Sequence, residues 1–261
     1  MAIDMKKIRA RKVALTNRNG NGGNGSYFWR PQDGEQTIRI VPTSDGDPFK
    51  DFWFHYNVGE NNGFLSPKKN FGEDDPLDTF VRKLFNEGTE ESVKMAKNLM
   101  ARQRFFAPVL VRGEEHKGVR VWGFGKMVYE QLINLVLNPE YGDITDSDTG
   151  TDLVLHYGKP AGAQFPQTKL TPRRRSSPLC DDAVGGDDRC AELLESIPDF
   201  NTLFERKTPE EVGAMLDAFL LGEEGTENMS NETTKYTAKD TEPPPPTTSS
   251  VDSAFEELMG A

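Results

Sequence analysis

Four short segments of the chain interleave aromatic side chains with cations: residues 28–30, 52–56, 102–106 and 120–122. Aromatic faces stack on the bases of single-stranded nucleic acid, at roughly 1–3 kcal/mol per base, while cations line the path of its backbone. Core filling is the alternative role for the aromatics. Adjacent side chains on a strand point to opposite faces, so the mixture fits a sheet with one buried and one binding face.

The candidate DNA contacts are the aromatics and cations of these segments and of their neighbours. They are Trp29, Arg30, Arg39, Trp53, Tyr56, Lys68, Lys69, Arg102, Arg104, Phe105, Arg112, Arg120, Trp122 and Lys126. Arg173, Arg174 and Arg175 form a further basic run in a stretch rich in Pro, Ser and Thr. For that run, a solvated surface or a mobile flap explains the charge equally well.

The negative charge of the chain is confined to its last third. The formal net charge is −11, yet residues 1–180 carry 26 Lys and Arg against 22 Asp and Glu. Residues 181–222 carry 3 cations against 11 acids, and residues 223–261 carry 2 against 9. Such asymmetry indicates a polyanion-binding body joined to an acidic tail.

Short strands separated by turn residues must position the candidate contacts. The pattern predicts strands within 27–30, 36–41, 49–56, 105–112, 118–124 and 153–157, which is typical of a small barrel or sandwich. Helices are expected to begin near Pro76, Thr89, Met127 and Thr208, where apolar residues follow at helical spacing. In the first helix, the expected buried face comprises Leu77, Phe80, Val81, Leu84 and Phe85.

The predicted fold class is therefore α+β, mainly β with α insertions. Residues 1–25 are interpreted as a basic arm and Gly-rich linker, and 26–180 as a core with a helical subdomain near 73–101. Residues 181–222 are expected to form a helical C-terminal part of the core. The polar, acidic stretch 223–261 is expected to be disordered, with a short amphipathic motif for binding other proteins at Phe255, Glu256, Glu257 and Leu258.

No motif assembles an enzyme active site, a metal centre or a cofactor pocket, so a non-enzymatic protein is expected. Asp74, Asp75 and Asp78 suggest a metal-dependent nuclease, but an N-cap role for Asp75 is the stronger interpretation. Cys180 and Cys190 are too few for a disulfide framework, and no secretory signal or membrane span is evident. We therefore expect a cytoplasmic protein in a reducing compartment.

The order of segments resembles the helix-destabilising single-stranded DNA-binding proteins of T-even-type tailed phages. Three segments carry the resemblance over roughly residues 1–222: Gln36-Thr-Ile-Arg-Ile-Val-Pro42, Phe105-Phe-Ala-Pro-Val-Leu-Val111 and Val119-Arg-Val-Trp-Gly-Phe-Gly-Lys126. The resemblance implies an OB-type barrel, cooperative coating of single strands, and roles in phage DNA replication, recombination and repair in the host cytoplasm. It also implies that Phe105 and Trp122 occupy the positions of base-stacking tyrosines.

The resemblance further implies partners for both ends of the chain. The basic arm, with Lys6, Lys7, Arg9, Arg11 and Lys12, would bind a neighbouring copy on DNA, and the acidic tail would contact replication and recombination proteins. One departure concerns zinc, which the family binds through one His and three Cys. Here Asp75-Pro76-Leu77-Asp78 stands in place of the cysteine element and His55 resembles the family histidine, so no structural zinc is expected.

The leading hypothesis is a sequence-independent single-stranded DNA-binding protein. An RNA-binding OB protein, a strand-annealing recombination mediator and the metal-dependent nuclease are the alternatives. A further hypothesis is that the acidic tail occupies the basic surface when DNA is absent.

Overall fold

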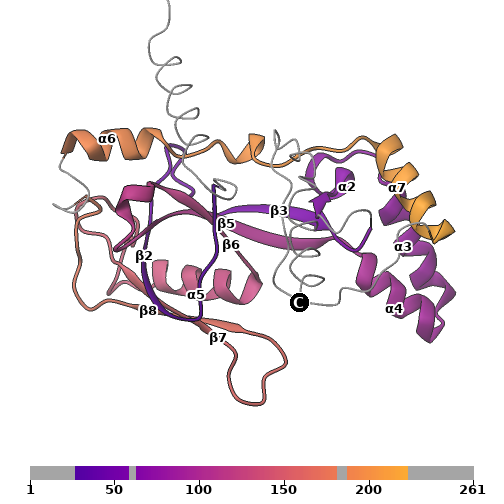
Figure 1. Cartoon of the computed structure of the whole chain (residues 1–261), viewed down its shortest axis with the longest axis horizontal. Helices are drawn as coiled ribbons and strands as arrows, with labels where there is room; N and C mark the ends of the chain where they lie inside the picture. The colour runs from indigo at the N-terminus through magenta and orange to yellow at the C-terminus, as the bar shows by residue number, and fades with distance from the viewer. Residues whose placement is uncertain (1–26, 59–62, 181–186, 223–261) are drawn as a thin grey trace, which may run out of the picture.

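The computed structural model describes residues 27–58, 63–180 and 187–222 of the chain. It has a mixed α+β architecture in which eight strands form one large sheet, accompanied by six α-helices (Figure 1). The sheet does not close into a barrel. The predicted α+β class is confirmed, whereas the predicted closed barrel is not found.

The sheet follows the order β1-β6-β5-β2-β7-β8. These strands are β1 (Phe28–Trp29), β6 (Arg120–Phe124), β5 (Arg102–Val111), β2 (Gly34–Ile40), β7 (Leu153–Gly158) and β8 (Gln167–Pro172). Only β1 with β6 is a parallel pair; the others along this path are antiparallel. The beginning of β5 also pairs with β3 (Lys50–His55), which in turn carries β4 (Phe64–Leu65). β8 was not foreseen from the sequence.

Strand β5 is the centre of the sheet and is buried on both faces. Its residues Phe105, Ala107, Val109 and Val111 belong to one core cluster, while Phe106 and Leu110 pack into clusters on the opposite face. This division follows the period of two along a strand. A strand covered on both faces needs a continuous apolar run, which explains the sequence from Phe105 to Val111.

Helix α5 (Lys126–Val136) covers the first face of the sheet. Val128 and Leu132 are its buried residues and belong to the cluster that contains Phe105. The side chain of Gln131 also accepts a hydrogen bond from the backbone N–H of Leu170 at 3.1 Å and donates one to the carbonyl of Thr168 at 3.4 Å. α5 therefore covers part of the free edge of β8, which would otherwise expose unpaired backbone groups.

The opposite face is covered by α6 (Asp187–Glu195) and by the segment that continues towards α7 (Pro209–Leu221), as Figure 1 shows along the top of the molecule. Leu193 of α6 packs with Leu110 and Leu179, and Phe200 and Phe204 pack with the aromatic cluster around Phe106. Phe200 opens the short 3-10 helix η2 (Phe200–Thr202), and a second one, η1 (Glu115–Lys117), joins β5 to β6.

Cys180 and Cys190 form a disulfide, with their Cα atoms 5.7 Å apart. This separation lies within the usual range for disulfides. The bond ties the chain after β8 to α6 and corrects the expectation that the two cysteines form no bridge. The inference of a reducing compartment from these cysteines consequently loses its support.

Four helices gather beside β3 and β4, at the end of the molecule on the right of Figure 1: α2 (Pro67–Phe71), α3 (Pro76–Glu87), α4 (Glu90–Leu99) and α7. Asp75, Thr89 and Thr208 cap α3, α4 and α7, which confirms the helix starts read from the sequence. Leu77, Val81 and Leu84 pack with Val212 and Leu216 of α7. Phe85 was expected on the same face but is 41% exposed. None of the helices in the described ranges is long and apolar enough to cross a membrane.

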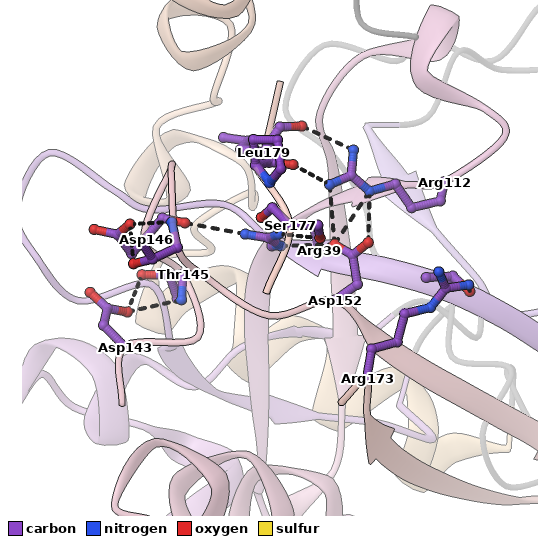
Figure 2. A network of polar contacts seen from close by, with 12 residues as sticks. Arg39, Arg112, Asp143, Thr145, Asp146, Asp152, Arg173, Ser177 and Leu179 are labelled. Carbon is purple, nitrogen blue, oxygen red and sulfur yellow. Dashed lines mark hydrogen bonds and ion pairs between the residues drawn. The ribbon is translucent and has the colours of Figure 1, made fainter. Parts of the chain in front are cut away.

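One carboxylate, Asp152 at the start of β7, joins two guanidinium groups from neighbouring strands (Figure 2). Arg39 donates to Asp152 Oδ1 at 2.9 Å, and Arg112 makes a bidentate contact in which Nε lies 3.1 Å from Oδ2 and Nη2 lies 3.1 Å from Oδ1. Arg112 also donates to the carbonyls of Pro178 and Leu179, and Arg39 to the carbonyl and hydroxyl of Ser177. The network fixes the chain after β8 against the sheet.

The Arg39 guanidinium is fully buried and therefore depends on these partners. Burial lowers the pKa of Arg39 from its ordinary value, while the charge and hydrogen bond of Asp152 oppose that effect. A Cβ atom at Gly150 would lie 2.4 Å from the carbonyl oxygen of Asp146 and 2.5 Å from Arg39 Nη1. The loop therefore requires glycine at position 150 to approach the guanidinium.

Replacement of Asp152 by Asn should reduce the free energy of unfolding by about 3–5 kcal/mol, because two guanidinium groups would lose the anion that compensates their burial. Urea denaturation followed by circular dichroism measures this loss. Asp148→Asn, an exposed site in the same loop, is the matched control and should change stability by less than about 0.5 kcal/mol. Equal effects of the two substitutions would contradict the structural role of Asp152.

Candidate nucleic-acid groove

The two ends of the open sheet border one cavity of about 360 Å³, which we call the groove. β1 and the residues after it form one side, the start of β8 forms another, and the β6–α5 junction lies between them. The lining residues are Phe28, Trp29, Arg30, Pro31, Arg104, Trp122, Gly123, Phe124, Gly125, Lys126, Met127, Val128, Tyr157, Pro166, Gln167 and Thr168. The groove thus exists because the sheet curves without closing.

The β6–α5 junction contributes both backbone N–H groups and a positively charged side chain to the groove. Gly125 is the N-cap of α5 and has no side chain that could bond the first helical N–H groups. The N–H of Val128 donates to the Gly125 carbonyl at 3.1 Å, whereas the N–H groups of Lys126 and Met127 have no acceptor in the preceding turn. Lys126 follows at the first helical position, with its side chain 75% exposed. Helix N-termini favour anions because their N–H groups and dipole point outward. The junction therefore adds an anion-compatible edge to the groove.

The charges on the groove lining are all positive. Arg30, Arg104 and Lys126 line it, and no Asp or Glu is among the lining residues. Arg30 is exposed, Arg104 is partly buried, and the ammonium group of Lys126 lies 3.6 Å from Glu130, outside the lining. The structure thus brings together three of the cations selected from the sequence, although each comes from a different segment of the chain: after β1, within β5 and at the start of α5.

The two tryptophans of the groove belong to its floor rather than to an open stacking face. Trp29 and Trp122 pack edge to face, with ring centroids 6.0 Å apart, and are 6% and 1% exposed. Trp122 is therefore a core residue, and its truncation to Ala would open a cavity in the protein. This position does not support the base-stacking role that the phage resemblance implies for Trp122.

Phe105 and Tyr56 are also buried. The Phe105 ring stacks on Tyr129 with centroids 4.0 Å apart and is 5% exposed. Tyr56 is 7% exposed and packs with Phe54. The alternation that suggested base stacking at Phe105 arises because one face of β5 is covered by α5 and the other by the aromatic cluster around Phe106.

Three of the predicted cationic contacts have partners inside the protein. Arg39 and Arg112 hold Asp152, and Arg120 pairs with Glu114 across the β5–β6 connection. Arg39 has no exposed surface, and the side chains of Arg112 and Arg120 are 13% and 15% exposed. These three arginines therefore stabilise the sheet, and their positions do not support the DNA contacts that were predicted for them.

Trp53, Lys68 and Lys69 form a second, separate group between β3 and α2. Lys69 is exposed, and its ammonium group lies 5.3 Å from the centre of the Trp53 ring. Lys68 is partly exposed and pairs with Asp78 at 3.3 Å. Arg102, at the start of β5, is exposed but does not line the groove. These residues are accessible, but the structure does not place them in the groove.

The remaining candidates lie outside the described residues. These are the arm residues Lys6, Lys7, Arg9, Arg11 and Lys12 and the tail residues Phe255, Glu256, Glu257 and Leu258.

Tyr157, Gln167 and Thr168 line the groove but were not selected from the sequence. A signal was available, because residues 158–177 contain five cations and no Asp or Glu. β8 escaped prediction because Leu170 is its only strongly buried residue, so its apolar alternation is too weak to read.

A second polar cluster, formed by His55, Ser66 and Asp75, lies beneath the helices. All three residues are buried. Nδ1 of His55 lies 2.9 Å from the Leu99 carbonyl, and Nε2 lies 3.1 Å from Asp75 Oδ2, which also accepts the Ser66 hydroxyl at 2.6 Å. Both ring nitrogens thus lie within hydrogen-bond distance of an oxygen atom. The Ser66 hydroxyl donates to Asp75 and not to His55, which is not the arrangement of an activated nucleophile.

The cluster does not fit the zinc site that the phage resemblance implies. A zinc-bound histidine must offer a ring-nitrogen lone pair to the metal, but both His55 nitrogens are engaged with oxygen acceptors. Asp75 is engaged as well, since its Oδ1 accepts the Asp78 N–H at 3.1 Å and caps α3. The side-chain atoms that a metal would need as ligands are therefore already engaged in the hydrogen bonds that stabilise this cluster.

The carboxylates of the nuclease alternative are directed to different partners. Asp75 faces His55 and Ser66, whereas Asp78 pairs with Lys68 at 3.3 Å and Arg82 at 2.9 Å. Asp74 is exposed. Within residues 27–58, 63–180 and 187–222, no group of three His, Cys, Asp or Glu side chains is placed to hold a metal ion.

No protein-family model matches the chain, and no curated protein shows significant sequence similarity to it. The resemblance to the phage proteins therefore stays a prediction that rests on the quoted segments.

The Asp75 carboxylate should make stability depend on acidity. Burial opposes its ionisation, but the hydrogen bonds from His55 and Ser66 and the charge of His55 outweigh burial and hold the pKa of Asp75 below its usual value. A carboxyl with a depressed folded pKa stabilises the protein above its unfolded pKa of about 3.9, and this stabilisation is lost as the pH falls below that value. Thermal unfolding at a series of pH values should show this loss.

Asp75→Asn should lower the unfolding temperature at neutral pH and flatten its decline below about pH 4, because the titrating group is gone. Asp74→Asn, at the exposed neighbour, is the control and should keep the wild-type profile. A decline that is equally steep in Asp75→Asn and wild type would show that other carboxyls govern acid unfolding.

Proposed function

We propose that this protein binds single-stranded DNA without sequence preference and without catalysis, with the groove as its primary site. The architecture is proposed to be an opened form of an OB-type barrel. In this view the protein coats and protects single strands during replication, recombination and repair of phage DNA. The phage setting rests on the sequence resemblance, and the DNA-binding proposal rests on the groove.

The observation that carries the proposal is the composition of the groove lining. It combines three cations with the aromatic residues Phe28, Trp29, Trp122, Phe124 and Tyr157, and it has no acid. Single-strand binding requires cations that track the phosphates and aromatic surface for the bases. Residues 1–180, which supply the whole lining, carry 26 cations against 22 acids, so an acid-free lining is a local selection from a nearly balanced set of charges.

Neutralising two of the groove cations should weaken DNA binding in a salt-dependent way. For Arg30→Gln combined with Lys126→Gln, the slope of log K against log salt should become less negative by about 1.4, since each lost phosphate contact contributes about 0.7. At 0.1 M salt, this slope corresponds to a loss of affinity of about 25-fold. Fluorescence anisotropy of labelled oligothymidylate measures both quantities.

The matched control for this variant is Lys94→Gln combined with Lys97→Gln, which removes the same charge from the exposed side of α4. It should change the affinity and the slope little, since α4 lies outside the groove. If the control loses as much affinity as the groove variant, net charge rather than the groove governs binding. If wild-type protein binds duplex DNA as tightly as oligothymidylate, the proposal of a single-strand binder fails.

Tyr157 is a groove aromatic that packs against the core cluster but keeps part of its surface exposed, where it could reach a base. It is partly exposed and lies at the end of β7, whereas both groove tryptophans are buried. Tyr157→Ala should lower the affinity for oligothymidylate by about 1–3 kcal/mol, the range for one stacked base. The unfolding midpoint should be measured in parallel, because a loss of affinity with a large loss of stability would assign Tyr157 to the core instead.

Competition and activity assays separate this proposal from its alternatives. Competition by oligouridylate equal to that by oligothymidylate would favour an RNA-binding protein. Accelerated pairing of complementary strands would favour an annealing mediator, and cleavage of labelled DNA with Mg²⁺ would indicate a nuclease.

The ends of the chain are proposed to regulate and extend this binding. Residues 223–261 carry 9 acids against 2 cations, which supports contact with replication and recombination proteins and competition with DNA for the basic surface. The cations from Lys6 to Lys12 are proposed to contact a neighbouring copy of the chain on DNA.

A further inference from the structure

The connection between β7 and β8 and the turn after β8 form the most consistently basic part of the described chain. Lys159, Lys169, Arg173, Arg174 and Arg175 are all exposed, and no Asp or Glu occurs from 158 to 177. The five cations greatly exceed what the groove uses, because the hairpin contributes Tyr157, Pro166, Gln167 and Thr168 to the groove lining and none of its charges. These charges therefore lie outside the groove and are accessible to a ligand that extends beyond it.

Strand β8 leads directly from the groove to the arginines. Gln167 lines the groove at the start of the strand, and the exposed residues Lys169 and Thr171 follow on the same face at every second position. At about 3.3 Å per residue, the path from Gln167 to Pro172 is about 17 Å long. Leu170 points to the opposite face and is buried. The outer face of β8 is thus a polar, cationic track that begins at the groove.

The arginine run is held in place at both ends. The backbone N–H of Arg173 donates to the Asp152 carbonyl at 2.9 Å, and its side chain donates to Thr37 Oγ1 at 3.2 Å. Four residues later, the Ser177 N–H donates to the Gly150 carbonyl at 3.1 Å, and Ser177 also accepts hydrogen bonds from Arg39. Figure 2 shows Arg173 beside Asp152, with Ser177 on the other side of the same network. Anchors on both sides argue against the mobile flap considered from the sequence.

Arg174 and Arg175 lie between these anchors and are exposed. Neither has an ion-pair partner among the residues that the structure describes. The acid nearest along the strand pairing is Asp152, next to Arg173, and its carboxylate is engaged with Arg39 and Arg112. Two exposed guanidinium groups on an anchored segment of backbone form a suitable contact for phosphate groups.

We propose that a bound single strand leaves the groove along the outer face of β8 and that Arg174 and Arg175 contact its phosphates. The inference rests on the proposed function of the groove and extends it by assigning the path of the strand. The bases would contact the groove, and the sugar–phosphate backbone would contact the track on the outer face of β8. Lys169 lies midway along this path. The track therefore binds only nucleic acid long enough to extend beyond the groove.

The test compares oligothymidylates of two lengths, about 5 and about 20 nucleotides, which bracket the site sizes of single-strand-binding folds. The variant is Arg174→Gln combined with Arg175→Gln, with Arg173 kept because its side chain contributes to the anchor. The matched control is again Lys94→Gln combined with Lys97→Gln. Anisotropy titrations at several salt concentrations give the affinity and the salt slope for each length.

For the long oligonucleotide, the arginine variant should bind about 25-fold more weakly at 0.1 M salt, with a slope less negative by about 1.4. For the short oligonucleotide, the variant should match wild type, and the control should match wild type at both lengths. An unchanged or tighter affinity for the long oligonucleotide would overturn the track; a tighter one would point to the acidic tail as its occupant. Equal losses at both lengths would also overturn it, because the arginines would then belong to the primary site.

The same data distinguish this inference from the proposed function. If wild type binds both lengths better than duplex DNA and the arginine variant binds both with wild-type affinity, the proposed function of the groove is supported and the track is ruled out. If wild type shows no preference for single strands at either length, the proposed function fails and the track fails with it.

Discussion

The shared ion pair of Asp152 with Arg39 and Arg112 is the interaction on which the arrangement of this molecule depends most. It joins β2, β5 and the start of β7, and through Ser177, Pro178 and Leu179 it fastens the chain that follows β8. A buried carboxylate between two guanidiniums is stable only when every partner is in place, since an uncompensated buried charge is costly. The positions of β8 and of the arginine run after it consequently depend on a network far from the groove.

The groove is a consequence of the open sheet. A sheet that closed β1 onto β8 would bury the edges that line the groove, whereas the curved but open sheet leaves space between them. α5 protects part of the exposed β8 edge through Gln131 and places Lys126 at the same opening. One helix thus reduces the hazard of an unpaired edge and supplies charge to the proposed binding site.

The helical end of the molecule is organised around one buried polar cluster. His55, Ser66 and Asp75 bond to one another and to the Leu99 carbonyl, so a single buried cluster connects β3, the turn before α2, the start of α3 and the end of α4. α7 then packs its apolar face on α3. The C-terminal segment reaches this end after α6 has packed on the sheet, and so it links the two parts of the fold.

Local chemistry in the sequence was sufficient for the features that depend on neighbours in the chain. The caps at Asp75, Thr89 and Thr208, the apolar run of β5 and most strands could be predicted, because capping and alternation act over a few residues. β8 could not be predicted, since its single buried leucine leaves no readable period. The open sheet likewise depends on residues brought together from distant parts of the chain. The Cys180–Cys190 bridge spans only ten residues, but it forms because the chain after β8 and α6 pack side by side.

The same dependence on distant contacts explains why the sequence alone could not define the candidate site. The sequence by itself determined that cations and aromatics are abundant before residue 180 and that acids dominate afterwards. It could not distinguish Arg39 from Arg30, although one is buried on Asp152 and the other is exposed at the groove. Only the tertiary structure decided which charges are buried in ion pairs and which lie at the surface, because burial and pairing are set by contacts between strands rather than by the residues on either side.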